Sequence, residues 1–279
     1  MKCEVVKTRG GASAIRDTAR GEVMHPGEGP EIEAATLYTS PSRLSERLSA
    51  GRDDMPPLVL FDIGLGAASN AIGAWKISAA LPANARQLAI ISFENDLTPL
   101  KLALSEEHRG AFGFADSAAH AAADHLMRHG EHSTPRTTWH LRFGDLMDGL
   151  KNEAHMADIV FWDPYSPKSD PHLWGVSAFA RLHGRCTQSA TVHTYSAATP
   201  TRAAMLLGGF FVGIGGATGG KSETTIAATR LDDLREPLGK RWLERLRRSS
   251  APLPNDILGG ANSRASVLAR IERLPQFQT

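Results

Sequence analysis

The sequence predicts an α/β protein with a doubly wound, largely parallel sheet and a small β extension before it. Continuous apolar runs, which suit strands buried on both faces of a parallel sheet, alternate along the chain with helix-forming segments. The first run, at residues 58–63, leads directly into the spaced glycines Gly64 and Gly66, which suit a tight strand-to-helix turn. The last two strand-forming segments have no helix between them, which indicates an antiparallel edge.

Composition limits the class of protein. The chain has 279 residues, of which 42% are hydrophobic. No apolar run approaches the ~18 residues of a membrane span. The N-terminal segment lacks the apolar core of a signal peptide, and Cys3 and Cys186 are the only cysteines, so we expect a cytoplasmic protein without a disulfide framework or a membrane contact. The net charge of +1 gives no general attraction to nucleic acid, so any basic surface must be local.

The chain is predicted to have three regions. Residues 1–55 form the β-rich extension, residues 56–230 the sheet domain, and residues 231–279 a basic, helical tail. The extension opens with a hairpin over residues 2–16, whose strands flank a glycine turn. A loop rich in Gly and Pro follows at residues 24–30, and the residues alone favour a solvated connector over a binding loop. The remaining expectations for the extension are a short strand at 34–38, a helix at 42–49 and a linker at 51–57.

The turn after the first sheet strand indicates which nucleotide binds. A helix predicted over residues 69–80 points its free N–H groups over this turn, which suits a ligand with acceptor atoms. Ser69 replaces the third glycine of the dinucleotide fingerprint, and the acid that ends the next strand, Glu94, lies farther on than that fingerprint expects. Asp62 can accept bonds from an ammonium group, which S-adenosylmethionine has and NAD lacks. The sequence therefore favours S-adenosylmethionine, and a glycine turn without a ligand is the alternative.

The following segments continue the strand and helix alternation. Glu94 ends a strand predicted at 87–94 and is placed to hold two ribose hydroxyls. Thr98 is expected to cap a helix that runs to residue 108. A second helical stretch is predicted over residues 111–132, where His125 and His129 are spaced to share one helix face. The absence of Cys, and of Glu at the zincin position, favours a solvated polar face over a metal site.

Two further strand ends carry carboxylates. Residues 138–143 lead into Gly144 and Asp145, and residues 157–162 lead into Asp163, Pro164 and Tyr165. The rest of the domain is predicted as a strand at 191–195, a helix at 201–207, and strands at 210–212 and 224–227 joined by a glycine-rich loop at 213–221.

The glycine-rich loop also matches the phosphate-binding P-loop pattern G-x-x-x-x-G-K-S, through Gly215, Gly220, Lys221 and Ser222. A P-loop requires a helix to open at the serine, whereas the β-branched residues at 224–226 predict a strand. This context argues against a P-loop, and a nucleotide triphosphatase is kept as the second enzyme class.

The tail carries a basic run around Trp242. A charged helix face in water is the usual meaning of such a run, and contact with phosphates is the alternative. Its basic residues are Lys240, Arg241, Arg245, Arg247 and Arg248.

Several separated segments together resemble the methyltransferase domain of the bacterial enzymes that form 5-methylaminomethyl-2-thiouridine in tRNA, the MnmC-like family. The matching segments are 62–66 with Asn70, 91–94, 143–145 and, most specifically, 163–168 with Pro171 and Trp174; the loop around His25 and Glu28 and residues 33–37 look like the family's N-terminal region. The resemblance implies a Rossmann-like, seven-stranded fold that uses S-adenosyl-L-methionine, acts on tRNA and converts 5-aminomethyl-(2-thio)uridine at the wobble position to its N-methyl product.

Two departures from the family pattern affect what can be carried over. Asp163-Pro164-Tyr165 replaces the Asp-Gly-Phe of the bifunctional enzymes, which concerns the substrate pocket. No FAD-dependent oxidoreductase domain is expected after the tail, so the substrate would have to arrive already as the aminomethyl uridine.

The resemblance and the residue chemistry together assign a site without a metal. The expected cofactor ligands are Asp62, Gly64, Gly66, Asn70, Glu94, Asn95, Gly144 and Asp145. Asp163 and the carbonyl of Pro164 would accept the N–H bonds of the substrate amine, and Tyr165 would stack on the uracil. The expected substrate-binding residues are His25, Glu28, Lys168, Trp174, Lys221 and Arg241. A methyltransferase for another amine, on a small molecule or a protein, and a non-catalytic RNA-binding module are the alternatives.

Overall fold

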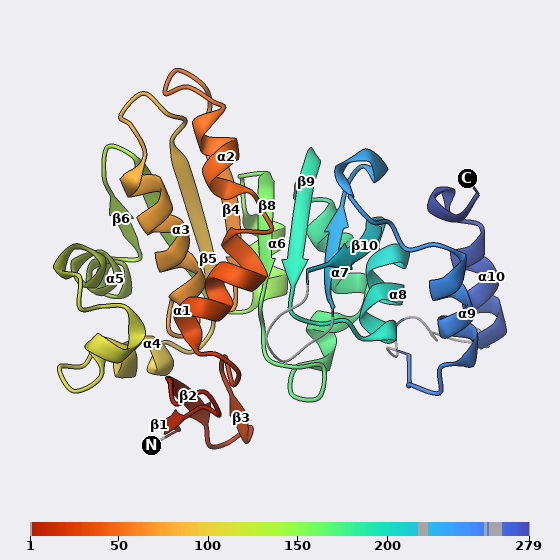
Figure 1. Ribbon diagram of the computed structural model, residues 1–279, viewed down its shortest axis with the longest axis horizontal. Helices are drawn as coiled ribbons and strands as arrows, with labels where there is room; N and C mark the ends of the chain where they lie inside the picture. Colours follow the sequence, from red (N-terminus) through yellow and green to blue (C-terminus); the bar gives the residue numbers. More distant parts are fainter. Residues whose placement is uncertain (1, 217–222, 254–255, 257–263, 279) are drawn as a thin grey trace.

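The computed structural model, which describes residues 2–216, 223–253, 256 and 264–278, is organised around one large sheet (Figure 1). The strand order is β10-β11-β9-β8-β4-β5-β7-β6. The central strands run parallel, and β11, β10 and β6 pair antiparallel at the two edges. The strand bounds are β4 Leu58–Ile63, β5 Leu88–Glu94, β6 Glu131–Ser133, β7 Thr137–Phe143, β8 Ala157–Trp162, β9 Cys186–Thr194, β10 Phe211–Gly215 and β11 Thr224–Ala228. The predicted doubly wound sheet with an antiparallel edge is confirmed. In this sheet the described residues form eight strands in place of the seven expected, because the short strand β6 pairs antiparallel with β7 at the second edge.

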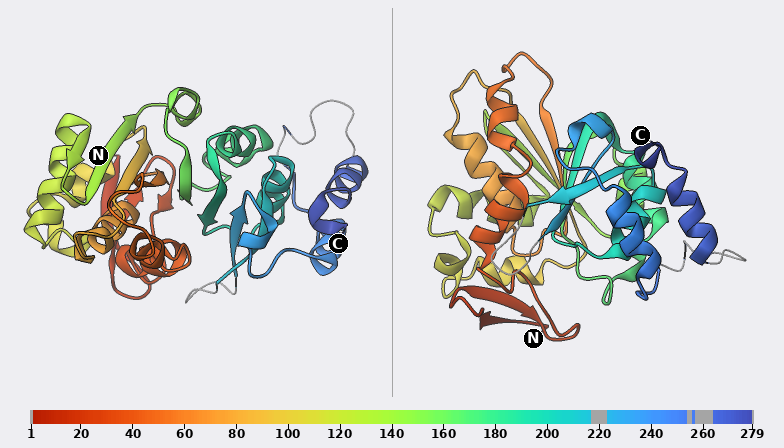
Figure 2. Two further views of the ribbon diagram at one scale, coloured as in Figure 1. Left: turned by 90° about the horizontal axis from the view of Figure 1, so that it is seen from above. Right: turned by 45° about the vertical axis from the view of Figure 1, so that its right-hand side comes forward.

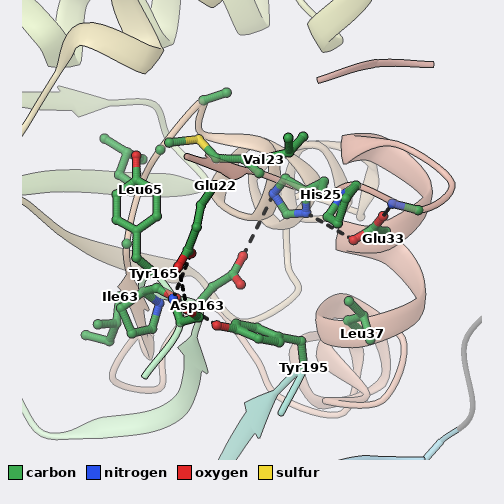
Figure 3. Close-up of a pocket in the computed structure, with 18 of the residues that line it drawn as sticks. Glu22, Val23, His25, Glu33, Leu37, Ile63, Leu65, Asp163, Tyr165 and Tyr195 are labelled. Atoms are coloured by element: carbon green, nitrogen blue, oxygen red, sulfur yellow. Dashed lines mark hydrogen bonds and ion pairs between the residues drawn. The ribbon is translucent and has the colours of Figure 1, made fainter. Parts of the chain in front are cut away.

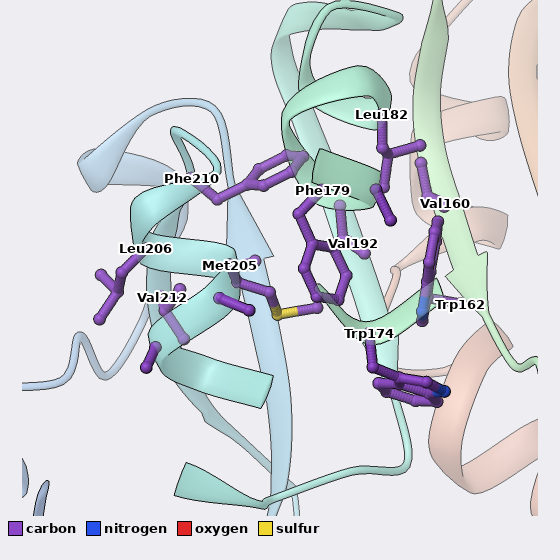
Figure 4. Packing of buried hydrophobic residues seen from close by; sticks show 14 of the residues in the cluster. Val160, Trp162, Trp174, Phe179, Leu182, Val192, Met205, Leu206, Phe210 and Val212 are labelled. Carbon is purple, nitrogen blue, oxygen red and sulfur yellow. The ribbon is translucent and has the colours of Figure 1, made fainter. Parts of the chain in front are cut away.

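Helices cover both faces of this sheet (Figure 2). Alternate residues of β4 enter different cores: Leu58 and Leu60 pack on one face, Phe61 and Ile63 on the other. The first core contains α2 (Leu44–Ser49), α3 (Ser69–Ala80), α4 (Thr98–Ala103) and α5 (Ser117–His129). The second core contains α6 (Leu146–Asn152), α7 (Val176–His183), α8 (Thr199–Leu207), α9 (Lys240–Arg248) and α10 (Arg264–Glu272). Figure 4 shows its centre, where Trp162, Phe179 and Met205 pack between β8 and the helices.

The N-terminal extension forms its own small antiparallel sheet beside the carboxyl ends of the central strands (Figure 1). Its strands are β1 (Cys3–Lys7), β2 (Ser13–Asp17) and β3 (Glu22–Val23). The predicted hairpin is confirmed with Val5 opposite Ile15. The strand predicted at 34–38 is wrong: α1 (Pro30–Glu33) continues into a π-helical turn over Ala34–Thr39. Buried Ala34, Leu37 and Tyr38 recur at helical spacing, which a short apolar run does not distinguish from a strand.

Two predicted helices are shorter than expected. Helix α4 ends at Ala103. Thr98 was expected to cap it but is its first residue; Leu97 is the N-cap, and Asp96 accepts from the backbone N–H of Thr98 at 2.9 Å. In the stretch predicted as one helix over 111–132, the α-helix is limited to α5; a 3₁₀ turn at Arg109–Phe112 precedes it and Glu131 already belongs to β6. That helix ends at Gly130, whose φ of 79° is left-handed, and the chain turns back into β6. The helices α6 and α7 are additions to the predicted pattern.

The last two strands form an antiparallel hairpin, with Val212 opposite Ala227. Gly220, Lys221 and Ser222 lie outside the described residues, but the strand β11 begins at Thr224, close to where a P-loop would need a helix. The P-loop interpretation therefore lacks its helical context. Beyond this hairpin, α9 and α10 pack against the core through residues such as Trp242 and Ile271. No helix among the described residues is long and apolar enough to cross a membrane.

Candidate active site

A pocket of about 850 Å³ opens at the carboxyl ends of the parallel strands, under the small N-terminal sheet (Figure 3). This is the edge at which open α/β sheets bind ligands. The lining brings together predicted residues from five separate segments. They are His25, Glu28, Gly64, Gly66, Glu94, Asn95, Gly144, Asp163, Pro164 and Tyr165.

The turn after β4 requires glycine for two reasons. Gly64 has a left-handed φ of 84°, and a Cβ at this position would lie 2.6 Å from the backbone oxygen of Asp163. Neighbouring strands β4 and β8 therefore bring their terminal loops into direct contact, because Gly64 has no side chain. The backbone of this turn stays open toward the pocket, where a ligand can approach it closely.

Glu94 is held by the backbone of two loops. Its Oε2 accepts from the N–H of Gly66 at 2.9 Å, and its Oε1 accepts from Asn95 and Asp96 at 2.7 and 3.0 Å. Burial raises the pKa of Glu94, and these backbone bonds oppose that rise. The carboxylate is thereby fixed at the pocket wall with lone pairs that can still accept bonds from ligand hydroxyls.

Asp62 lies behind the turn and is not part of the pocket lining. Its Oδ2 accepts from the hydroxyl of Ser92 at 2.7 Å, and burial is the main cause that raises its pKa to about 7. Its Oδ1 is buried without a hydrogen-bond partner among the described atoms. A buried acceptor without a partner fits a donor from a ligand such as an ammonium group.

Asp163 follows β8 and is surrounded by polar groups. Asn70 donates to its Oδ2 at 2.8 Å, while the amide oxygen of Asn70 is buried without a partner among the described atoms. Burial raises the pKa of Asp163, and nearby His25, the Tyr38 hydroxyl and Asn70 oppose that rise. The side chain is 15% exposed and faces the pocket, so a bound amine could reach it (Figure 3).

His25 completes this group from the loop before α1. Its Nδ1 lies 3.6 Å from Oε2 of Glu33, and its Nε2 lies 3.8 Å from Oδ2 of Asp163. Burial lowers the pKa of His25, but the two carboxylates outweigh burial and the net shift is upward. The loop at 24–30 is thus a wall of the pocket, and the favoured interpretation of this loop as a solvated connector is wrong.

The loop after Asp163 is braced on both sides. The carbonyl of Pro164 accepts from the hydroxyl of Tyr195 at 3.2 Å. The guanidinium of Arg20 lies over the ring of Tyr165, 4.5 Å from its centre, so one face of this ring is already covered. Trp174 was expected to bind substrate, but it is 1% exposed and donates its indole N–H to the carbonyl of Tyr165 at 2.7 Å. It supports the loop from beneath.

A second brace comes from β3, and the sequence did not indicate it. Glu22 accepts from the backbone N–H of Ser166 at 3.1 Å, from the Ser166 hydroxyl, and from the Ser169 hydroxyl at 2.5 Å. Burial raises the pKa of Glu22, but these bonds outweigh it and hold the pKa below its ordinary value. Glu22, Glu33 and Tyr195 are thus pocket residues that sequence reasoning missed.

Besides Asp62, Asn70 and Trp174, three further predicted site residues lie outside the pocket lining, and a fourth is not described. Asp145 is exposed and caps α6 by accepting from the N–H groups of Met147 and Asp148, so its carboxylate serves the helix. Lys168 is exposed and outside the lining. Arg241 lies on α9, at the β10 end of the sheet (Figure 1). Lys221 lies outside the described residues.

The histidines of α5 form a separate surface group. The rings of His125 and His129 lie 4.3 Å apart, and Nδ1 of His125 contacts the carbonyl of Glu131 at 2.8 Å. Within the described ranges, no group of three or more His, Cys, Asp or Glu side chains could hold a metal.

Comparisons with known proteins give a consistent result. Residues 116–230 match a family model described as S-adenosyl-L-methionine-dependent methyltransferase. The tRNA 5-methylaminomethyl-2-thiouridine biosynthesis bifunctional protein MnmC of Methylibium petroleiphilum is 28% identical over 219 residues, which cover 74% of this chain and 32% of that protein. The protein of the same name from Hahella chejuensis is 28% identical over 228 residues, which cover 78% and 36%. The chain spans about a third of the length of these curated relatives.

Solved structures agree on the fold. The crystal structure of MNMC2 from Aquifex aeolicus has a TM-score of 0.71 at 23% identity, over 96% of this chain and 83% of that chain. A spermidine synthase in complex with a transition-state analogue has a TM-score of 0.54 at 13% identity, over 98% and 82%. The predicted fold class and the resemblance to the methyltransferase part of MnmC proteins are confirmed.

Proposed function

We propose that this chain methylates the primary amine of 5-aminomethyl-(2-thio)uridine at the wobble position of tRNA. The premise is that the chain is an S-adenosyl-L-methionine-dependent methyltransferase similar to the methyltransferase part of MnmC proteins. S-Adenosyl-L-methionine would supply an electrophilic methyl group, and tRNA would be the partner. Because tRNA is the substrate, the proposal also places the chain in the cytoplasm.

The cofactor assignment rests on acceptors at the right edge of the sheet. Glu94 would hold the ribose hydroxyls, the turn at Gly64 and Gly66 would lie under the methionine part, and the unpartnered Oδ1 of Asp62 is available for the ammonium group. Gly144 and Asn95 line the pocket beside Glu94, on the side proposed for the adenine. Asp145 caps α6 through its Oδ1, and its exposed carboxylate lies outside the pocket lining.

The substrate assignment rests on one observation: Asp163 and Pro164 present acceptor oxygens to the pocket directly beside the glycine turn. An amine that attacks a methyl group in line needs mainly correct placement, because a cationic donor requires little acid catalysis. Asp163 would accept N–H bonds from the amine and aim its lone pair. Tyr165, which lines the pocket, would stack on the uracil through the face opposite Arg20.

The proposal is tested by methyl transfer to tRNA that carries 5-aminomethyl-2-thiouridine, read by nucleoside mass spectrometry. Asp163→Ala should keep S-adenosyl-L-methionine binding within a few-fold, while the methylation rate falls by about 10²-fold or more, the usual range for a positioned acid–base group. Asp124→Ala on α5, outside the pocket lining, is the matched control. A wild-type protein that binds the cofactor but leaves this nucleoside unmethylated refutes the substrate.

A second experiment, the salt dependence of tRNA binding, separates the proposal from a methyltransferase for a small-molecule amine. Binding to tRNA through phosphate contacts releases counterions, so affinity should fall steeply between low and physiological salt. The exposed Lys168 is a candidate for such a contact. A flat salt dependence, or no binding to tRNA at low salt, would favour the small-molecule substrate.

A further inference from the structure

The pocket wall contains an imidazole held between two carboxylates. The Nδ1 of His25 faces Glu33 at 3.6 Å and its Nε2 faces Asp163 at 3.8 Å (Figure 3). The side chain of His25 is 13% exposed, and His25 lines the pocket. The backbone of His25 has a left-handed φ of 52°, an uncommon conformation for a residue with a side chain. The surrounding contacts therefore hold this ring at the pocket in spite of a local conformational cost.

Glu33 fixes both the ring and the loop that carries it. Its Oε1 accepts from the N–H of Gly27 at 2.7 Å, and its Oε2 faces the ring of His25. A proton on Nδ1 that points at Glu33 leaves Nε2 as the acceptor nitrogen, on the side of Asp163 and the pocket. This is the arrangement in which a carboxylate orients an imidazole for work at its other nitrogen.

The chemistry assigned to this pocket requires a base. An aliphatic amine is mostly protonated at neutral pH and has no lone pair in that form. Asp163 can hold the neutral amine, but a carboxylate is a weak base toward an ammonium group, whereas imidazole is much closer to it in proton affinity. The imidazole that lies next to Asp163 is that of His25.

We propose that His25 accepts the proton of the substrate ammonium at its Nε2, and that Glu33 positions the ring for this step; the inference rests on the proposed function. One N–H bond of the ammonium breaks, the proton moves to Nε2, and the electron pair stays on the substrate nitrogen. That pair forms the new N–C bond while the C–S bond of the donor breaks and its electrons remain on sulfur. His25 then releases its proton to solvent through its exposed edge.

The charges around the ring determine the expected pH dependence. The groups that face it are Glu33 from α1, Asp163 from the end of β8 and, farther back, Asp62 from β4, all of which favour the protonated ring. Only neutral His25 can accept a proton, so the rate should fall as the pH falls through the pKa of His25. Glu33→Gln removes one negative charge and should move this acid limb to lower pH.

The test combines three measurements on His25→Gln and Glu33→Gln, with His129→Gln on the outer helix α5 as the matched control. Calorimetry should show affinity for S-adenosyl-L-methionine within a few-fold of wild type for all variants. In an NMR titration, the imidazole signal that is missing from His25→Gln identifies His25. The midpoint of that signal's titration should move to lower pH in Glu33→Gln. Single-turnover methylation of tRNA carrying 5-aminomethyl-2-thiouridine should slow by about 10² to 10⁴-fold in His25→Gln at pH 7.

The pH profile distinguishes a base from a structural residue. The defect of His25→Gln should shrink as the pH rises toward the pKa of the substrate amine, because the amine then loses its proton without help. Two outcomes, each with an active wild-type protein, would overturn the role of His25 without affecting the proposed function. One is a rate defect of His25→Gln that is the same at every pH; the other is an acid limb of the pH profile that is unchanged in both variants. A wild-type protein inactive on this tRNA overturns the proposed function, and this inference with it.

Discussion

The carboxylate of Glu94 offers a quantitative test of the cofactor site. In Glu94→Gln the side chain keeps its shape, but it loses its charge and exchanges one acceptor oxygen for an NH₂ donor. That donor would then face backbone N–H groups, since both oxygens of Glu94 accept from the backbone of Gly66, Asn95 and Asp96. The substitution therefore acts on ligand binding and on the two loops that form the pocket.

The size of the effect follows from the bonds involved. Two ribose hydroxyls would lose a charged acceptor, and hydrogen bonds to charged groups contribute about 1.5–3 kcal/mol each. If the glutamine still contributes about 1 kcal/mol to each of the two bonds, the binding free energy falls by about 1–4 kcal/mol. Because each ~1.4 kcal/mol is tenfold in affinity, we expect the binding of S-adenosyl-L-methionine to weaken by about fivefold to several hundredfold.

Calorimetric titration with S-adenosyl-L-methionine at pH 7.5 or another fixed pH near neutrality measures this loss directly. Thermal unfolding without ligand measures the separate effect on the loops. Glu131→Gln is the matched control, because its side chain is 65% exposed on the edge strand β6. Affinity of Glu94→Gln equal to that of wild type would refute the assignment of the ribose to this carboxylate.

Two further predictions concern stability. Glu153→Gln should lower the free energy of unfolding by about 3 kcal/mol at pH 7. Burial raises the pKa of Glu153, but the bonds from His155 and Arg142 outweigh burial and lower this pKa from 4.5 to about 2. This stabilisation is present above pH 4.5 and is lost as the pH falls toward about 2, so denaturant unfolding at pH 7 and pH 3 should show a smaller difference from wild type at pH 3. Gly64→Ala should cost about 1–3 kcal/mol through its left-handed backbone and its contact with the Asp163 carbonyl, and should also weaken cofactor binding, whereas Gly110→Ala, with open space at its Cβ, should be tolerated. Equal unfolding free energies for the two alanine variants would contradict the close packing of the β4 and β8 loops.

The sequence by itself determined the central sheet and the acidic residues at the carboxyl ends of its parallel strands. Buried parallel strands need apolar residues on both faces, so β4, β5 and β8 were visible as continuous apolar runs. Because the carboxyl ends of parallel strands share one edge, the acids that end these runs had to lie near one another. Glu94 and Asp163 were predicted on that ground, and both line the pocket.

What a polar side chain does at that edge depended on its local partners. Asp145 follows β7 just as Asp163 follows β8, yet the first turn of α6 engages its carboxylate. Trp174 lies in the most family-like segment, yet its ring is buried under the loop. Sequence position alone did not separate these cases, because a residue that caps a helix or supports a loop has the same chemical type as one that binds a ligand.

Only the tertiary structure decided which distant segments complete the pocket. Glu22 braces the loop at Ser166 across 144 positions of the chain. His25 reaches Asp163 from the extension, with Glu33 at the other nitrogen of its ring. No periodicity or spacing encodes such contacts, because they are set by how the small N-terminal sheet and α1 pack over the carboxyl ends of the strands. Regular elements follow from local patterns of apolar residues, whereas the pairing of charged groups across the pocket follows from the way those elements pack together.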